Sequence, residues 1–532
     1  MTRWHDVNGI YQIYPRSFKD SNGDGIGDLP GIIEKLRYIK DGRHSLGIDA
    51  IWISPFFKSP MADFGYDISD YYTVDPLFGT NDDFKRLLKE AHHREIKVMI
   101  DYVPNHTSDQ HEWFKESRSS RDNPRRDWYV WHDPKPDGSP PNNWLSVFGG
   151  SAWEYDEVTG QYYLHSFLAA QPDLNWDNPV VRKAMTSVLD YWLSMGVDGI
   201  RADAVRWLSK DTVLFEDNPP NPNYKEGDDL YHKQLQLRSR YGDLLDSYLY
   251  EIAATVAKYP DRIILFEDYP DERINEDAQY VNFYSIYPKV AAPFNFDGMR
   301  TPYSASAFRG FIDNFQDLLG RELRPFYCFS NHDQSRLASR VGHQQAKLIG
   351  MMQLTLPGIP VVYYGDELGM HDVVMPQEIV RDPFGLAQPR LGRDPERTPM
   401  QWTTGVNAGF SVDRPWLPLA NDSAQNNVEA EFEDPSSFLS MYHSLLELRH
   451  EHDLHTGVYH RWEGSNDQVF GYTRKSGDHV FLMLFNMSDT PVNCQEVHGA
   501  VIYSTHPSIQ WDAESCVTLE PHQGLITRYH QD

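Results

Sequence analysis

Polar side chains stand at the ends of four short apolar segments in the first two thirds of the chain. These ends read DYVPNH (101–106), GIRADA (199–204), FED (266–268) and SNHD (330–333). Each contributes a carboxylate, and three of them add a histidine or an arginine. A retaining glycosidase needs such a set, because one carboxylate attacks the anomeric carbon while a second protonates the leaving oxygen and then activates water. The pattern therefore favours glycoside hydrolysis.

The residue types suggest a different catalytic role for each carboxylate. Arg201 lies two residues before Asp203, so on a strand both side chains share one face and the cation favours an ionised Asp203. This makes Asp203 the candidate nucleophile. Glu267, on the next segment, lies in the field of other carboxylates that help it to hold a proton, which suits a general acid/base. Asp333 is the third carboxylate, placed to bind sugar hydroxyls and to stabilise a cationic transition state.

The elements that must position these groups repeat along the first 370 residues. Eight apolar runs occur, at Ile10–Tyr14, Ile48–Ser54, Ile96–Val103, Gly199–Ala204, Arg262–Glu267, Pro293–Phe296, Pro325–Ser330 and Ile359–Tyr364. Amphipathic helical patterns such as Asp82–His93 and Asn178–Met195 lie between many of them. Strands alternating with helices predict a parallel sheet covered on both faces, and eight of them predict a (β/α)₈ TIM barrel with its catalytic groups at the strand ends. A doubly wound sheet is the alternative, but its glycine-rich phosphate turn is absent.

The alternation of strands and helices is interrupted twice, and the pattern changes near the C-terminus. These departures predict further structural units. Residues 104–178 are too long for one loop and predict a small inserted domain after strand three, between barrel segments 1–103 and 179–455. A long polar excursion covers roughly 371–425. From 456 to 532, apolar runs separated by Gly, Asn and Pro predict an antiparallel β-sandwich domain.

The net charge and the cysteine content of the chain limit the classes of partner that it can bind. The formal net charge is −28 over 532 residues, which disfavours nucleic acids and anionic membranes but is compatible with a neutral sugar. The three cysteines exclude a disulfide framework and show no metal-ligand spacing. Because no secretory signal pattern or membrane-length apolar run occurs, we expect a cytoplasmic protein, either monomer or homodimer.

Taken together and in order, the motifs resemble those of glycoside hydrolase family 13, the α-amylase superfamily. They are DYVPNH (101–106), QPDLN (171–175), GIRADAVRW (199–207), LFEDYP (265–270) and FSNHD (329–333). The resemblance implies Asp203 as nucleophile, Glu267 as acid/base and Asp333 as transition-state stabiliser. It also implies that three further residues bind the glucose unit, namely His106, Arg201 and His332.

One position departs from the family pattern. A small residue, commonly Gly, often precedes the catalytic glutamate, whereas this chain has Phe266 there and Asp268 after it. Glu251 and Asp261 are the competing candidates for the acid/base, but neither ends an apolar run.

Two more segments are similar to the α-glucosidase and oligo-1,6-glucosidase branch of that family. They are ADFGYDISDY (62–71) and ERTPMQW (396–402). The resemblance implies that Tyr66 stacks on the terminal glucose, while Asp63 and Arg397 pair across the pocket floor and hold its 4-hydroxyl. Phe167 is expected to line the same pocket. A pocket closed beyond one glucose implies an exo-acting enzyme.

The residue after the nucleophile influences linkage preference in that branch. Ala204, rather than valine, implies α-1,4 substrates such as maltose and malto-oligosaccharides, with sucrose also plausible; one pocket side chain is typically worth about 1–3 kcal/mol of discrimination. Transglucosylation is expected beside hydrolysis. The alternatives are an oligo-1,6-glucosidase, a sucrose- or maltose-isomerising glucosyltransferase, and a non-catalytic relative of the transporter heavy chains.

The segment DSNGDGIGD (20–28) has the oxygen-rich pattern of a cation loop. Its candidate side-chain ligands are Asp20, Asn22, Asp24 and Asp28. Resemblance to related α-glucosidases adds the Ile26 carbonyl and implies structural Ca²⁺ or Mg²⁺, with no organic cofactor. Position twelve of the loop is Gly31 rather than Glu, so the segment is not an EF-hand.

Overall fold

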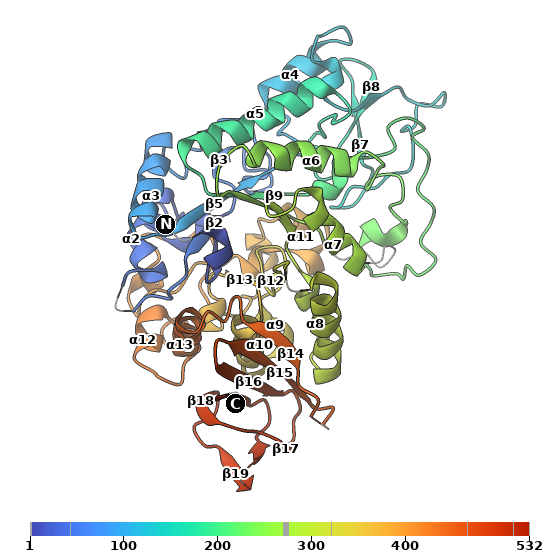
Figure 1. Cartoon of the computed structure of the whole chain (residues 1–532). Helices are drawn as coiled ribbons and strands as arrows, with labels where there is room; N and C mark the ends of the chain where they lie inside the picture. The colour runs from blue at the N-terminus through green and yellow to red at the C-terminus, as the bar shows by residue number, and fades with distance from the viewer. Residues whose placement is uncertain are drawn as a thin grey trace.

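Eight parallel strands form a closed sheet at the centre of the molecule. The computed structural model describes residues 3–42, 44–269, 276–320, 322–464, 466–513 and 515–530, so Pro270 of the LFEDYP motif lies outside these ranges. The strands are β1 (Ile10–Ile13), β2 (Ala50–Ile53), β5 (Lys97–Tyr102), β9 (Gly199–Ala202), β10 (Ile263–Phe266), β11 (Ala291–Pro293), β12 (Phe326–Cys328) and β13 (Ile359–Tyr363). Their order is β11-β10-β9-β5-β2-β1-β13-β12, and a parallel bridge from Asn295 to Tyr327 joins the two ends. The labelled strands β2, β5, β9, β12 and β13 lie near the centre of the molecule in Figure 1. The predicted TIM barrel is confirmed.

Helices surround this barrel, and those at Asn81–His93 and Pro179–Met195 lie where amphipathic patterns predict them. The surrounding helices include α2 (Leu29–Ile39), α3 (Asn81–His93), α5 (Pro179–Met195), α6 (Leu245–Val256), α7 (Glu276–Ile286), α8 (Ala305–Leu319) and α10 (His343–Thr355). Thr80 and Asp83 form a capping box at the start of α3, which satisfies amide groups that have no partner within the helix. Gly196 ends α5 with φ of 117°, a left-handed conformation that glycine adopts without strain.

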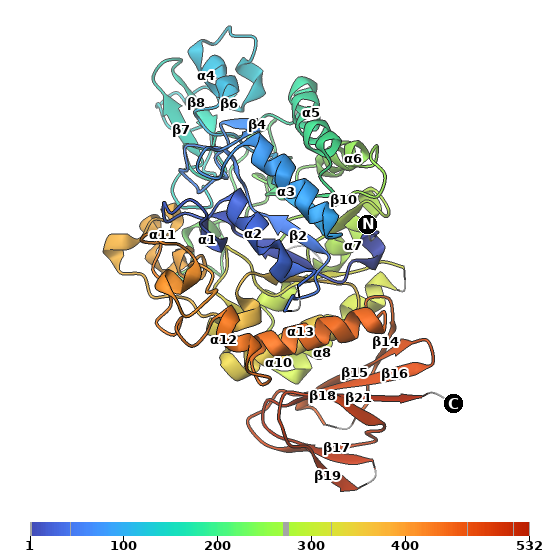
Figure 2. The same ribbon diagram turned by 90° about the vertical axis from the view of Figure 1, so that its left-hand side faces the viewer.

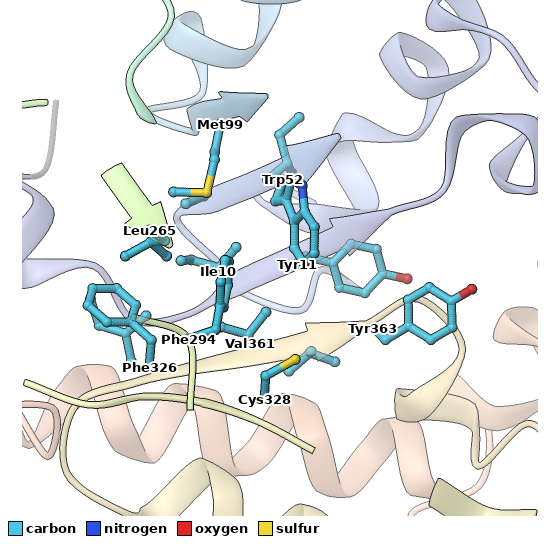
Figure 3. Packing of buried hydrophobic residues seen from close by; sticks show 14 of the residues in the cluster. Ile10, Tyr11, Trp52, Met99, Leu265, Phe294, Phe326, Cys328, Val361 and Tyr363 are labelled. Carbon is cyan, nitrogen blue, oxygen red and sulfur yellow. The ribbon is translucent and has the colours of Figure 1, made fainter. Parts of the chain in front are cut away.

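The barrel interior is a packed apolar core rather than a channel. Side chains from successive strands fill it, among them Ile10, Trp52, Met99, Leu265, Phe326 and Val361 (Figure 3). The core fixes the strands and so presents their carboxyl ends as one rigid platform for polar groups.

The sixth strand and one hairpin differ from the sequence prediction. The sixth strand was expected at 293–296 but spans Ala291–Pro293, with only Asn295 bridged beyond it. Proline has no amide hydrogen for the sheet, which favours a strand that ends there. A two-stranded hairpin, β3 (Phe57–Lys58) with β4 (Asp70–Val74), was not predicted. It holds the loop that contains Asp63 and Tyr66.

The segment 104–178 contains its own small sheet and helix. Strands β6 (Trp131–His132), β8 (Gln161–Leu164) and β7 (Trp153–Asp156) form an antiparallel sheet beside α4 (Glu112–Ser119). Bridges from His106 to Asp173 and from Tyr129 to Leu174 return the chain to the barrel. The excursion 371–425 contains only α11 (Pro383–Ala387) and single 3₁₀ turns.

Two antiparallel sheets form the C-terminal part. The first contains β14 (Val458–Arg461), β15 (Val469–Ser476), β16 (His479–Asn486), β21 (Gly524–His530) and β18 (Ala500–Ser504), and the second contains β17 (Val492–Gln495), β20 (Cys516–Leu519) and β19 (Gln510–Ala513). Both sheets contribute buried apolar residues to one cluster, as the β-domain prediction requires. Figure 2 shows this part packed below α8, α10 and α13 (Phe438–Glu451). In the described ranges no helix is both long and apolar enough to cross a membrane.

Candidate active site

The carboxyl ends of β5, β9 and β10 bring three carboxylates onto one guanidinium. Arg201 Nη1 lies 2.6 Å from Asp203 Oδ1 and also contacts Asp101, while Nη2 lies 2.8 Å from Glu267 Oε1. The Ala204 amide donates to Glu267 Oε2 at 2.7 Å. The parallel register that pairs Asp101 with Arg201 and Leu265 with Arg201 explains the convergence. Carboxylates from three neighbouring strands therefore meet at Arg201.

This carboxylate cluster retains a proton more readily than an isolated aspartate does. Burial raises the pKa of Asp203 well above its usual range, and Glu267, Asp101 and Asp333 raise it further, whereas Arg201 opposes them. The expectation that Arg201 favours an ionised Asp203 is therefore incomplete, because one guanidinium serves three acids. A retaining glycosidase also needs one protonated carboxyl, and strongly coupled acids share such a proton as a group.

Asp333 has the opposite environment. Its Oδ1 lies 2.9 Å from Arg397 Nη2 and 3.2 Å from Arg393 Nη1. Burial raises its pKa, but the two arginines oppose burial, and the pKa lies well below its usual range. Asp333 is therefore an anion at any working pH, which suits a group that stabilises positive charge on a sugar ring.

His332 and Tyr66 form a stacked pair beside this anion. Their ring centroids are 5.5 Å apart at an interplanar angle of 7°, and the Tyr66 hydroxyl lies 2.5 Å from His332 Nε2. The Gln12 side-chain amide donates to His332 Nδ1 at 2.8 Å, so the neutral ring carries its hydrogen on Nε2. Burial lowers the pKa of His332 to about 3. The ring is therefore a neutral hydrogen-bond donor.

The pocket floor corrects the predicted pairing of Asp63 with Arg397. Asp63 Oδ1 pairs with Arg393 Nη2 at 2.7 Å, and its Oδ2 accepts from Gln171 Nε2 at 3.1 Å. Arg397 instead binds Asp333 and donates to the His332 carbonyl. The two arginines flank one short 3₁₀ turn, Asp394–Glu396, and only Arg393 lines the cavity.

These groups line one cavity of about 240 Å³ at the mouth of the barrel. It is smaller than the roughly 300–1,000 Å³ of sites for drug-sized ligands, which suits a single sugar ring plus part of a leaving group. The predicted residues on its wall are Asp63, Tyr66, His106, Phe167, Asp203, Ala204, Glu267 and Asp333. Phe167 packs between His106 and Trp207, with centroids 5.1 Å from each. Arg201, His332 and Arg397 lie behind this wall and contact its carboxylates.

The competing acids lie outside the cavity lining. Glu251 pairs with Arg182, and Asp261 pairs with Lys97. Asp268 accepts from the Tyr241 hydroxyl at 2.7 Å and pairs with Arg206. Among the four acids compared here, Glu251, Asp261, Asp268 and Glu267, it is Glu267 that contacts Arg201 and lines the cavity.

Sequence reasoning missed two groups that matter to this geometry. Arg393 stands four residues before the recognised Arg397, and the repeated arginine in GRDPERTPMQW was the available signal. Gln171, the first residue of the QPDLN motif, joins Asp63 to His106 Nε2, with 3.1 Å to each. A polar residue in a recognised motif was the signal there.

The loop 20–28 is organised by its own amide groups. Asp20 accepts from the amides of Asn22, Gly23 and Gly25 and from Ser411 Oγ, while Asp28 caps α2. Across the described ranges, no three His, Cys, Asp or Glu side chains are grouped as metal ligands. The carboxylates of the loop therefore do not converge here, and its cation binding stays a prediction.

Comparisons with known proteins agree over nearly the whole chain. A model of the α-amylase catalytic domain matches residues 12–457. An oligo-1,6-glucosidase of Heyndrickxia coagulans is 40% identical, with 93% of this chain and 94% of that protein covered. An α-glucosidase of Culex pipiens is 39% identical, with 91% and 82% covered. The crystal structure of an α-glucosyl transfer enzyme has a TM-score of 0.91 at 38% identity and covers 99% of this chain and 100% of that one.

Proposed function

The chain belongs to the α-amylase family of glycoside hydrolases, and we propose that it is a retaining, exo-acting α-glucosidase. It releases α-glucose from the non-reducing end of maltose and short malto-oligosaccharides, with sucrose as a further substrate. The observation that carries the proposal is the ion pair between Asp63 and Arg393 in the same cavity as Asp203 and Glu267. A charged floor that closes one side of a small cavity favours removal of a single terminal sugar.

The side chains suggest the following steps. An oxygen of Asp203 attacks the anomeric carbon as the bond to the leaving oxygen breaks, and Glu267 gives its proton to that oxygen. Glu267 then removes a proton from water, whose oxygen displaces Asp203 and yields α-glucose. The anionic Asp333 opposes the positive charge of both transition states. Tyr66, backed by the stacked His332 ring, holds the sugar, and His106 and Phe167 border it.

Transfer competes with hydrolysis in this mechanism. A sugar or alcohol hydroxyl that reaches the glucosyl-Asp203 intermediate can replace water as the nucleophile. The structural similarity to an α-glucosyl transfer enzyme supports this extension. Oligo-1,6-glucosidase activity is the second candidate, because such an enzyme of Heyndrickxia coagulans is 40% identical. Ala204 lines the cavity and favours α-1,4 linkages instead.

A substrate panel with product analysis tests this function. Maltose, isomaltose, maltotriose, sucrose and soluble starch are incubated with the wild type and with Asp203→Ala. We expect α-glucose as the first product, maltose cleaved faster than isomaltose, little action on starch, and no measurable turnover by the variant. Rapid mid-chain cleavage of starch would contradict the closed floor, β-glucose would contradict retention, and isomeric disaccharides as main products would favour an isomerase.

We also propose that the loop 20–28 binds Ca²⁺ or Mg²⁺ in a structural role and that the enzyme works in a reducing, cytoplasmic compartment. The Asp- and Asn-rich spacing supports the first proposal, and three unpaired cysteines support the second. EDTA should lower the melting temperature, and excess Ca²⁺ should restore it, with little change in kcat at 25 °C. An unchanged melting temperature after complete chelation would contradict the cation.

A further inference from the structure

We infer that Asp382 is a positioning residue for the glucose pocket, because its carboxylate holds Arg393 against Asp63 and Asp333. This inference rests on the proposed function of the pocket. Asp382 lies in the excursion that follows β13, far in sequence from the catalytic motifs. It is fully buried and does not line the cavity. It therefore acts on a sugar only through the residues that it positions, above all Arg393.

The Asp382 carboxylate accepts hydrogen bonds from both the side chain and the backbone amide of Arg393. Its Oδ1 lies 2.7 Å from Arg393 Nη2 and 3.1 Å from Nε, and its Oδ2 accepts from the Arg393 amide at 2.8 Å. These contacts leave Nη1 facing Asp333, 3.2 Å away, while Nη2 also reaches Asp63 at 2.7 Å. A guanidinium held by a side-on carboxylate has one orientation rather than several.

The backbone around Asp382 is built for this close approach. The Asp394 carboxylate accepts from the amides of Arg381 and Asp382, so the segments before and after α11 are held together. Gly385 and Gly392 pack at van der Waals contact, since a Cβ on Gly385 would lie 2.8 Å from Gly392 Cα. Any larger side chain there would separate Asp382 from Arg393.

The same aspartate also places part of the cavity rim. Asp382 is the N-cap of α11, where its carboxylate accepts from the Gly385 amide at 3.3 Å. This short helix carries Phe384, whose ring packs against Phe148 with centroids 5.0 Å apart. Phe148 in turn covers the Arg393 guanidinium at 5.2 Å. One residue thus links the excursion, the inserted segment and the pocket floor.

Substitution of Asp382 by asparagine separates its charge interaction with Arg393 from its capping of α11. Asparagine caps helices about as well as aspartate does, but it carries no charge for Arg393. We expect Asp382→Asn to raise KM for maltose and the inhibition constant of glucose about tenfold, with kcat reduced less than threefold. Glu378→Gln, an exposed acid of the same excursion, is the matched control and should change neither constant.

The decisive measurement is a double-mutant cycle with Arg393→Lys. If Asp382 acts through Arg393, the double variant should have the same KM as Arg393→Lys alone; independent effects that multiply would overturn the inference. A folded Asp382→Asn with wild-type constants would also overturn it. Asp382→Ser, which still caps α11, serves if the asparagine variant does not fold, and loss of folding in both would assign Asp382 a purely structural role. Inactivity of the wild type on every α-glucoside would instead reject the proposed function.

Discussion

Arg201 is the residue on which the charge balance of the site depends. It is fully buried and contacts Asp101, Asp203 and Glu267 at once. Removing a partner from a buried ion pair costs about 3–5 kcal/mol, because a charge is left without compensation. Here three anions share one cation, so the cluster gains stability by keeping a proton. The proposed mechanism assigns delivery of a proton to the leaving oxygen to Glu267.

Glu267 should therefore be needed for poor leaving groups and much less for good ones. Glutamine at this position can still accept from the Ala204 amide but has no proton to give. We expect Glu267→Gln to slow hydrolysis of maltose about 10²–10⁴-fold. With α-glucosyl fluoride, whose fluoride departs without protonation, the rate of glucosyl-enzyme formation should stay within about tenfold of wild type.

Two observations complete this test. Asp203→Asn must lose both activities, because the nucleophile is required whatever the leaving group. Pre-steady-state release of fluoride and of glucose distinguishes the first chemical step from the second. Equal losses on maltose and on the fluoride would mean that Glu267 is not the acid.

The sequence identified most of these residues but not their pairings. Asp203, Glu267 and Asp333 follow from strand ends, since the barrel fold dictates where such ends meet. The partner of Asp63 does not follow from any periodicity. Arg393 and Arg397 have the same residue type and flank one 3₁₀ turn. Only the fold of an irregular loop decides which one lines the cavity.

At the scale of elements, the regular strands and helices were predicted from the sequence better than the irregular loops. Seven of the eight strands overlap closely with apolar runs, and α3 and α5 begin within one residue of their predicted starts. The β3–β4 hairpin and the internal fold of the predicted excursion were not foreseeable, because side-chain carboxylates and backbone amides hold them. An example is Asp75, whose Oδ2 accepts from the Ser59 amide at 3.0 Å. Such contacts carry no periodic signal.

The packing of α12 (Val428–Phe432) on α13 predicts a pH-dependent stability. Glu431 lies between the two helices, and its carboxyl accepts from the Leu439 amide at 2.9 Å. Burial raises the pKa of Glu431 to about 8. An acid whose pKa is higher in the folded state binds its proton mainly there, so the stability it confers is lost as pH rises from about 5 to 8. Glutamine cannot titrate and should remove this dependence.

Thermal unfolding at pH 5 and pH 8 measures the effect. Glu431→Gln should be more stable than wild type at pH 8 by roughly 2–4 kcal/mol and close to wild type at pH 5. Glu429→Gln, an exposed neighbour on the same helix, is the control for loss of charge. Parallel pH responses of wild type and Glu431→Gln would show that this carboxyl does not titrate between these values.

At the scale of the whole molecule, two buried arginines bind the end of α10, one from the neighbouring helix α13 and one from the C-terminal sheet. Arg449 of α13 donates to the carbonyls of Leu354 and Leu356, at 3.0 and 2.8 Å, where α10 ends. Arg474 of β15 donates to Thr355 O at 2.6 Å and to Gly457 O at 2.7 Å. Helix ends leave carbonyls without intrahelical partners and attract cations. Burial lowers the pKa of Arg449 to about 9 and that of Arg474 to about 10.

Arg474→Met should therefore destabilise the whole chain without altering the chemistry. Methionine can fill much of the volume, but it leaves the carbonyls of Thr355, Leu454 and Gly457 without this donor. Each buried carbonyl left unsatisfied costs about 1–3 kcal/mol, so we expect a loss of roughly 3–5 kcal/mol. Because none of these groups lines the cavity, kcat on maltose at 25 °C should remain within twofold of the wild-type value.

Denaturant unfolding measures the loss of stability, with Lys475→Met, an exposed neighbour on the same strand, as the control. Similar unfolding midpoints for the two variants would mean that the sheets attach to the barrel through apolar contact alone.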